Sequence, residues 1–310
     1  MNLFKISIRP TSFFHTPLRS DIIWGHICWA IFRLKEELEL KDFLDKYKKG
    51  NFPIVVSDVF PEGYLPAPKY PGIIRYFSET KVDIDLKELK KAKYIPVSIY
   101  EKLKESFEAF LEGLKIYFSN DEDKISSCFL NFDEWHCSIN RLTGIVEEGM
   151  LFSKECMVAR EEVKPIVYVK TLFDKSYIEE IFKFIGENGY GADASVGRGR
   201  FEFDISDATL PESKKPNSFI ALSHGFESLS EFKRCFYDVE VKFGKVGNNI
   251  SKNPFKRPVV NFKPGSLFIL KENSEPKAAY GRIKDSVHSS IDFVHECSLL
   301  FPFFVRWQDG

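Results

Sequence analysis

The residues best suited to bind a ligand lie in a glycine-rich loop at residues 189–200, with the sequence GYGADASVGRGR. Its glycines are Gly189, Gly191, Gly197 and Gly199. Glycine has no Cβ and accepts positive φ angles, so such a loop can bring backbone N–H groups close to a phosphate. Arg198 and Arg200 alternate with the last glycines and can present guanidinium groups to phosphates or base edges. The loop is therefore predicted to hold phosphate or ribose groups.

Two familiar nucleotide-binding loops do not fit this segment. A dinucleotide-binding loop runs from a strand through glycines into a helix, and a P-loop ends in Gly-Lys-Ser/Thr. Here a predicted helix enters the loop and a predicted strand leaves it. A connection that merely makes tight turns is the structural alternative, but the arginines lie between the glycines, which favours phosphate contact. Asp193 is an unusual neighbour for a phosphate, and we expect it to cap the loop or to orient Arg198 and Arg200.

A second polar group lies between the first predicted strand and the first predicted helix. A helix N-terminus offers free N–H groups and the positive end of its dipole to an anion. We predict ligand contacts from His15, Thr16, Arg19 and Ser20. Simple capping of the helix by Ser20 or Asp21 is the alternative, and both can hold at once.

Two histidines are the only residues here that suggest catalysis. His15 and His26 flank the start of the first predicted helix, and histidine can act as a general base on a hydroxyl. Neither has an evident acid partner in the sequence. We favour core or surface histidines and predict no catalytic residue.

Two further segments combine positive charge with hydroxyl or aromatic groups. Asn140, Arg141 and Thr143 lie at a hairpin predicted at 141–152, where ligand contact is favoured over a salt bridge from Arg141 to Glu147 or Glu148. The densest basic segment holds Lys252, Phe255, Lys256 and Arg257. Phosphate contact with base stacking and a solvated loop are both open for it.

Bulk composition gives no global sign of a nucleic-acid ligand. The chain has 310 residues, 44% hydrophobic and 29% charged, with a formal net charge of −1. RNA binding would therefore depend on local basic patches in a neutral chain. The 31 phenylalanines are unusually many, and we expect most in the core or in subunit interfaces.

The cysteines do not form a metal or disulfide pattern. There are 6, without a CxxC, which indicates reduced thiols in the cytoplasm. Cys128, His136 and Cys137 lack residues that would complete a ligand set, so no metal and no cofactor is predicted. Neither a signal peptide nor a membrane-spanning run is recognisable, and no membrane association or small-molecule substrate is expected.

Hydrophobic periodicity predicts an α+β protein of two units. The first unit covers 1–210. It opens with a strand, a helix that is capped by Asp21 and stops by Gly50, and a second strand. Strands are predicted at 3–9, 54–60, 163–172 and 201–205, and a helix capped by Asp174 precedes the loop. An insertion at about 69–140 contains a helix over Ser98–Phe118, opened by a capping box of Ser98 and Glu101 and expected to dock on the domain.

The second unit covers 217–310 and follows a polar linker at 212–216. It is predicted to hold strands near 218–223, 265–270 and 299–305, a short helix near 229–235 and a long loop at 244–256. These elements predict two ferredoxin-like (RRM-type) units, of which the second is degraded.

These ordered motifs resemble the RAMP superfamily of CRISPR RNA-binding proteins. The resemblance is carried by the glycine loop, by FHTPLRSDIIWGHICWA at 14–30, by NRLTG at 140–144 with EGMLF at 148–152, and by NPFKRP at 253–258 with PGSLF at 264–268. Within that superfamily the chain resembles the fourth Csm subunits of type III-A effector complexes, which are Cas-five-like. The matches span most of the chain in the right order.

The resemblance implies a non-catalytic, RNA-binding structural subunit in antiviral defence. Such a subunit holds the 5′ handle of the CRISPR RNA, with the glycine loop against the RNA and the hairpin near 140 as a thumb. We predict that Ser195 joins the loop glycines and arginines in this contact. The partners implied are the crRNA handle, the large polymerase-like Csm subunit and the backbone Csm subunit.

Two other functions remain open from the sequence. One is a metal-independent endoribonuclease that processes precursor crRNA, because histidine serves as the base in related CRISPR nucleases. The other is a protein-interaction module whose glycine loop is a structural turn.

Overall fold

The computed structural model describes residues 1–80, 84–120, 124–247, 252–285, 287–291 and 294–308, without the side chains of 147, 148 and 150. A four-stranded sheet in the order β2-β7-β1-β8 forms its centre, and each strand is antiparallel to its neighbours. The strands are β1 (Asn2–Pro10), β2 (Ile54–Pro61), β7 (Pro165–Thr171) and β8 (Phe201–Asp207). Strands had been predicted from the sequence at each of these places.

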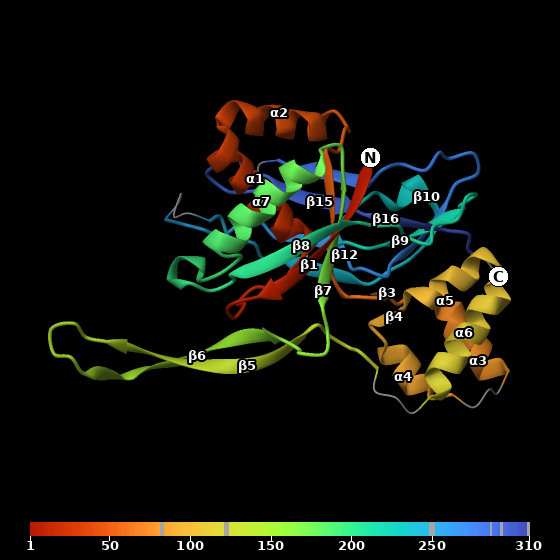
Figure 1. Cartoon of the computed structure of the whole chain (residues 1–310), viewed down its shortest axis with the longest axis horizontal. Coiled ribbons are helices and arrows are strands. Elements are labelled where there is room, and N and C mark those ends of the chain that lie inside the picture. The colour runs from red at the N-terminus through yellow and green to blue at the C-terminus, as the bar shows by residue number, and fades with distance from the viewer. Residues whose placement is uncertain (81–83, 121–123, 248–251, 286, 292–293, 309–310) are drawn as a thin grey trace.

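Helices cover one face of this sheet (Figure 1). They are α1 (Ser20–Lys35), α2 (Glu37–Lys48) and α7 (Lys175–Asn188). In β1, Phe4, Ile6 and Ile8 point into a core shared with these helices, as the alternating sequence predicts. The Asp174 side chain accepts a hydrogen bond from the Tyr177 amide at 2.9 Å, so the predicted cap of α7 is confirmed.

The single helix predicted after Asp21 is wrong in two respects. The helix begins at Ser20, and no side chain caps it, since Asp21 is buried in the first turn. The chain also breaks at Glu36, where φ is 81°, and α2 follows as a separate helix. This break lets Tyr47 of α2 pack on Trp24 of α1, with ring centroids 5.6 Å apart.

The insertion forms a small helical layer beside the sheet. It contains β3 (Tyr64–Pro66), α3 (Pro71–Glu79), α4 (Leu86–Lys91), β4 (Tyr94–Pro96), α5 (Val97–Glu101), η1 (Lys102–Lys104) and α6 (Phe107–Ser119). The continuous helix predicted over Ser98–Phe118 is therefore wrong. The cap of its longer part is Ser106, whose hydroxyl accepts from the Ala109 amide at 3.0 Å, whereas Ser98 is exposed. The predicted docking is confirmed, because Phe110, Leu111 and Leu114 are buried.

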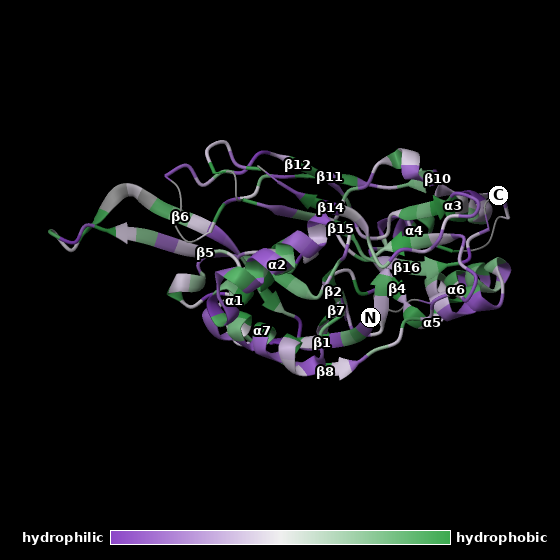
Figure 2. Cartoon of the chain, turned by 90° about the horizontal axis from the view of Figure 1, so that it is seen from above, coloured by the Kyte–Doolittle hydropathy of each residue, from purple (hydrophilic) through white to green (hydrophobic). Residues whose placement is uncertain are grey.

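A long hairpin projects from the body of the molecule. It consists of β5 (Phe129–Ile139) and β6 (Val146–Ala159), paired antiparallel from Phe129↔Ala159 to Ile139↔Val146. It extends alone to the left in Figure 1 and again in Figure 2, which is turned by 90°. The hairpin predicted at 141–152 is present and starts earlier than the sequence indicated.

The second half is built of strands. A sheet in the order β10-β13-β9-β16 is flanked by the pairs β11–β12 and β14–β15. Their bounds are β9 (Ser218–Ala221), β10 (Phe232–Phe236), β11 (Val239–Lys242), β12 (Val259–Phe262), β13 (Leu267–Leu270), β14 (Tyr280–Lys284), β15 (Glu296–Leu300) and β16 (Pro302–Val305). The predicted short helix near 229–235 is wrong: the 3-10 turn η3 (Leu229–Glu231) runs directly into β10. The predicted last strand is divided at Phe301 into β15 and β16.

The α+β class is confirmed, while the ferredoxin-like character of both units stays a prediction. No α-helix is found in the described part of 217–310. The two halves share their cores: Val55 and Tyr168 of the first sheet pack in one cluster with Leu222 and Phe301. No described helix is long and apolar enough to span a membrane.

Candidate functional site

The glycine loop leaves α7 and folds tightly on itself before β8. Gly189, Gly191, Gly197 and Gly199 all have positive φ, from 69° to 92°. A Cβ on Gly199 would lie 2.0 Å from the Tyr190 carbonyl oxygen, and one on Gly189 would lie 2.5 Å from the Arg198 oxygen. Around Gly197 there is open space. Two of the glycines therefore serve close backbone contacts inside the loop, and Gly197 serves the turn alone.

Most amides of the loop already have acceptors within the chain. The Gly191 amide donates to His26 Nε2 at 3.0 Å, and the Ala192 amide donates to Thr16 Oγ1 at 2.9 Å. The Gly199 amide donates to the Phe13 carbonyl at 2.8 Å. Within the described residues, acceptors are lacking for the amides of 193–195. The loop thus offers a ligand fewer backbone donors than its glycine content suggests.

The histidine of the first helix is a structural acceptor. His26 receives the Gly191 amide on Nε2, and its ring lies 4.7 Å from that of Tyr190. Burial lowers the pKa of His26 to about 4, so the imidazole is neutral at neutral pH. The lone pair of His26 Nε2 already accepts the Gly191 amide, so this nitrogen is not free to take a proton from a ribose hydroxyl.

The base of the hairpin is fastened to the loop by charged side chains. Asp193 accepts from His15 Nδ1 at 2.6 Å and from Lys154 Nζ at 2.8 Å, and Arg198 pairs with Glu134. Hydrogen bonds from Lys154 and His15 lower the pKa of Asp193 below its usual range. Asp193 therefore holds His15 and the hairpin, and Glu134 is the residue that orients Arg198.

The exposed predicted residues lie at separate places. Ser195 and Arg200 are exposed on the glycine loop. At the hairpin tip, the Asn140 side chain accepts from the Leu142 amide at 2.9 Å, and Arg141 and Thr143 are exposed. The alternative partners of Arg141, Glu147 and Glu148, have side chains outside the described residues.

The basic segment of the second half is divided between surface and interior. Lys252 and Arg257 are exposed, and the 56% exposed ring of Phe255 lies 5.2 Å from Lys245 Nζ. Lys256 is turned inward instead, with its Nζ 2.7 Å from Glu296 Oε2.

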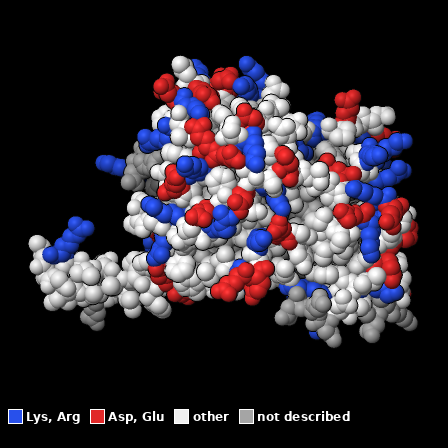
Figure 3. Space-filling model, viewed as in Figure 1, with Lys and Arg blue, Asp and Glu red and all other residues white. Residues whose placement is uncertain are grey.

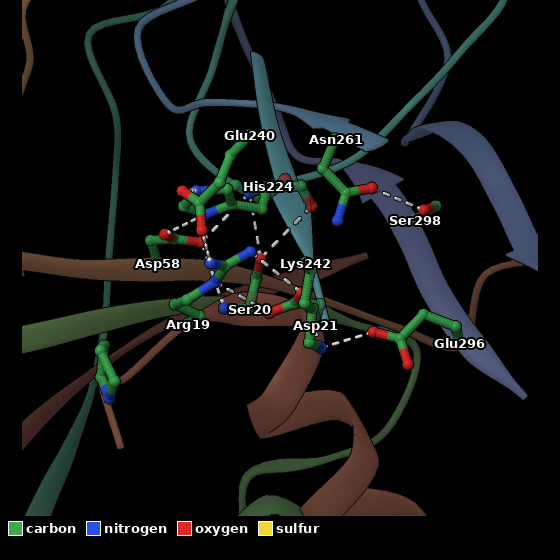
Figure 4. Close-up of polar contacts among 12 residues, drawn as sticks. Arg19, Ser20, Asp21, Asp58, His224, Glu240, Lys242, Asn261, Glu296 and Ser298 are labelled. Carbon is green, nitrogen blue, oxygen red and sulfur yellow. Dashed lines mark hydrogen bonds and ion pairs between the residues drawn. The ribbon is translucent and has the colours of Figure 1, made fainter. Parts of the chain in front are cut away.

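Arg19, Ser20 and Lys256, three predicted ligand residues, belong to a buried polar network where the two halves meet; Figure 4 labels the first two. Arg19 pairs with Asp21 and Glu240, and the Ser20 amide donates to Asp58 Oδ1 at 3.1 Å. Lys256 and Lys242 both pair with Glu296, which is 3% exposed. This junction network, formed by Arg19, Ser20, Asp21, Asp58, His224, Glu240, Lys242, Lys256 and Glu296, joins α1 and β2 to β11 and β15.

A buried histidine carries positive charge in this network. His224 Nδ1 lies 2.6 Å from Asp58 Oδ2, and its Nε2 lies 3.4 Å from Glu240 Oε2. Burial alone would lower the pKa of His224, but the charge of Asp58 and the hydrogen bonds to Asp58 and Glu240 outweigh it and raise this pKa to about 9. The Arg19, Ser20 and Lys256 side chains thus have structural partners, and Thr16 and His15 support the loop.

Sequence reasoning missed the hairpin residues that reach the loop. Glu134, Lys154 and Cys156 lie on one face of the hairpin, because Glu134 faces Lys154 and Phe132 faces Cys156 across the strands. The other face and the tip expose apolar side chains, including Trp135 (67%) and Leu142 (97%). The available signal was short, because apolar residues alternate only over Trp135, Cys137 and Ile139.

Comparisons with known proteins identify the fold. No protein-family model and no curated protein matches the chain. Solved structures do match over its full length: a chain of a Csm1–Csm4 cassette in complex with pppApA, at a TM-score of 0.61 and 16% identity, and a chain of a Csm3–Csm4 subcomplex of a type III-A CRISPR–Cas interference complex, at 0.62 and 17%. Each match covers 100% of both chains. A type III-B Cmr-beta complex bound to cognate target RNA matches 86% of the chain, at 0.50 and 14%.

The chain therefore has the fold of a subunit found in type III CRISPR complexes. Among these, its fold is that of Csm4. This agrees with the resemblance drawn from the sequence motifs.

We expect the loop glycines to differ in their tolerance of alanine. Gly197→Ala should destabilise the protein by about 1–2 kcal/mol, the cost of a left-handed conformation with a Cβ. Gly199→Ala should cost about 1–3 kcal/mol more, because its Cβ meets the Tyr190 carbonyl. Urea unfolding followed by circular dichroism measures both, and equal losses would contradict the close-contact role of Gly199.

The protonated His224 predicts a loss of stability at alkaline pH. Its folded pKa of about 9 lies above the unfolded value of about 6.5, so its contribution is complete below pH 6.5 and disappears as pH rises through 9. The shift corresponds to about 3 kcal/mol. Unfolding free energies at pH 6 and pH 9.5 should differ by this much more in the native protein than in His224→Gln. A parallel pH dependence in the two proteins would exclude a charged His224.

Proposed function

We propose that this protein is a non-catalytic, RNA-binding structural subunit of a type III-A CRISPR effector complex. In it the chain would hold the 5′ handle of the guide RNA and contact a large polymerase-like subunit and a backbone subunit. The full-length likeness in fold to Csm4 chains carries the proposal. We further propose that residues 1–210 form a ferredoxin-like RAMP domain and that 217–310 form a second, degraded one.

The hairpin supports a role inside an assembly. A two-stranded hairpin is marginally stable alone, and this one exposes apolar side chains far from the core. The face of the hairpin that Figure 3 shows is largely uncharged except at its tip, whereas acidic and basic groups alternate over the body. Exposed apolar surface of this kind is typical of a contact with a partner. Its tip holds Leu142, Ile145 and Arg141, which combine apolar and positive groups.

Both candidate bases are engaged within the chain, His26 through Nε2 and His15 through both ring nitrogens, which supports a non-catalytic role. His26 Nε2 accepts the Gly191 amide, and His15 is held between Asp193 and Cys156. A precursor-cleaving endoribonuclease would need one of them free near a ribose hydroxyl.

For RNA binding we expect few direct phosphate contacts, made by exposed arginines. Arg141→Ala and Arg200→Ala should each make the plot of log affinity against log salt shallower by about 0.7, the value of one contact on a single strand. Fluorescence anisotropy with a labelled guide RNA isolated from the native complex measures this slope. Lys256→Ala is the control, because its ammonium is held by Glu296 and its removal should leave the slope unchanged.

A cleavage assay on the same guide RNA separates RNA binding from RNA cleavage. An RNA labelled at both ends should remain intact with the isolated protein, with or without divalent metal. Cleavage that depends on His15 or His26 would overturn the non-catalytic assignment.

For assembly we expect the hairpin tip to be required. Leu142→Asp with Ile145→Asp should reduce co-purification of the other complex subunits or of guide RNA by at least about tenfold, since burying an unpaired carboxylate is costly. Leu38→Asp is a matched control, because Leu38 is a 79% exposed leucine on α2, away from the hairpin. Co-purification from the native operon that is equal for all three proteins would remove the hairpin from the interface.

A further inference from the structure

Three metal-binding side chains converge where the hairpin meets the body. They are His15 from the segment after β1, Glu134 from β5 and Cys156 from β6. Glu134 Oε2 lies 3.3 Å from His15 Nε2 and 3.3 Å from Cys156 Sγ, and His15 Nε2 lies 2.8 Å from Cys156 Sγ. The three residues lie at positions 15, 134 and 156, so no metal-binding spacing motif in the sequence predicts the cluster.

We propose that His15, Glu134 and Cys156 form a binding site for a divalent transition metal, best fitted by Zn²⁺. Zinc takes imidazole nitrogen at about 2.0–2.1 Å, carboxylate oxygen at about 2.0–2.2 Å and thiolate sulfur at about 2.3 Å. Tetrahedral geometry then separates ligand atoms by about 3.3–3.6 Å. The two distances from Glu134 Oε2 agree with this, and the distance from His15 Nε2 to Cys156 Sγ opens by about 0.7 Å to admit the ion.

Backbone pairing brings the ligands together independently of any ion. Phe14 and Met157 form an isolated β-bridge, with Phe14 N to Met157 O at 3.0 Å and Met157 N to Phe14 O at 2.8 Å. His15 and Cys156 are the chain neighbours of this bridge. Glu134 lies on the same hairpin face as Cys156, since residues two apart in a strand share a face.

The residues around the three ligands orient them as in known zinc sites. His15 Nδ1 lies 2.6 Å from Asp193 Oδ2, so Nδ1 carries the proton and the Nε2 lone pair points at the other ligands. Lys154 holds Asp193 at 2.8 Å. Arg198 occupies Glu134 Oε1, which leaves Oε2 for the ion. A carboxylate that holds the distal nitrogen of a ligand histidine is the usual partner in such sites.

Charge and donor softness favour zinc over a hard cation. A thiolate and a carboxylate neutralise the two charges of the ion, and the imidazole is neutral. Binding forms a metal–sulfur bond and releases the thiol proton of Cys156 to solvent. Thiolate and imidazole select zinc rather than Mg²⁺ or Ca²⁺, which take oxygen ligands. With three protein ligands, water fills the fourth position. The Nε2 atom of His136 is 3.3 Å from Glu134 Oε2 and has no hydrogen-bond partner in the described structure, so it can bond to that water.

The ion would fasten both hairpin strands to the segment after β1. This function concerns the angle of the hairpin and is independent of RNA binding or of the assembly partners. Metal binding would therefore persist even if the proposed RNA role failed.

Tag-free protein, stripped with a chelator and reloaded with Zn²⁺ or Co²⁺, tests the site. We expect about one equivalent of zinc by elemental analysis and, with Co²⁺, a thiolate-to-cobalt charge-transfer band. At a hundredfold excess over Kd, zinc should raise Tm by about 4 °C. Cys156→Ala should abolish the band. Cys137→Ser, which removes an exposed thiol from the other face of β5, should retain it.

Two milder variants keep the test decisive if Cys156→Ala or His15→Ala fails to fold. Asp193→Asn should weaken zinc affinity by about 10–100-fold, the usual effect of losing the carboxylate behind a ligand histidine. Glu134→Gln should weaken it at least as much. The proposal is overturned if the reloaded native protein holds no metal. It is equally overturned if Cys137→Ser loses the cobalt band or if Asp193→Asn and Glu134→Gln bind zinc as the native protein does.

Discussion

The close approach of Tyr190 and Gly199 sets the path of the glycine loop, and with it the positions of the loop's charged side chains. The Tyr190 amide donates to the Gly199 carbonyl at 2.9 Å, and a Cβ at Gly199 would lie 2.0 Å from the Tyr190 oxygen. With the two ends of the loop held together, Asp193 and Arg198 both reach the hairpin. The hairpin is then fixed by groups from the loop, and the segment after β1 closes against both.

The junction network follows from the cost of burying charge. Glu296 is 3% exposed, and an isolated carboxylate there would be strongly unfavourable. Lys242 and Lys256 compensate it, as Asp58 and Glu240 compensate His224. A network of this kind adds little net stability over an apolar contact, but removing one member is costly. It therefore fixes how the two halves sit together and withdraws Arg19 and Lys256 from the surface.

Local chemistry made part of this structure predictable. The alternation in β1, the Asp174 cap and the glycine loop are properties of adjacent residues, and all three are present. The break at Glu36 was not predictable, because no glycine or proline marks it and the contact it allows, Tyr47 on Trp24, joins residues far apart in the sequence. The roles of Arg19 and Lys256 depend on carboxylates more than 35 positions away, at Glu240 and Glu296. From the sequence alone, each lysine or arginine is taken as a charge free to bind a ligand, because the carboxylate that pairs with it is brought close only by the fold.

Of the cations predicted to bind a ligand, Arg19 and Lys256 are paired internally, so the proposed RNA recognition would depend on those that stay exposed. Arg200, Arg141, Lys252 and Arg257 remain at the surface on three separate loops. With a net charge of −1, the chain has little long-range attraction for RNA, so the proposed RNA contact would draw on shape and apolar groups as well as charge. The hairpin offers both, with Trp135 and Leu142 exposed beyond a base that ion pairs tie to the glycine loop. His15, Glu134 and Cys156 lie at that base, so the proposed metal would set the angle at which the hairpin presents these side chains.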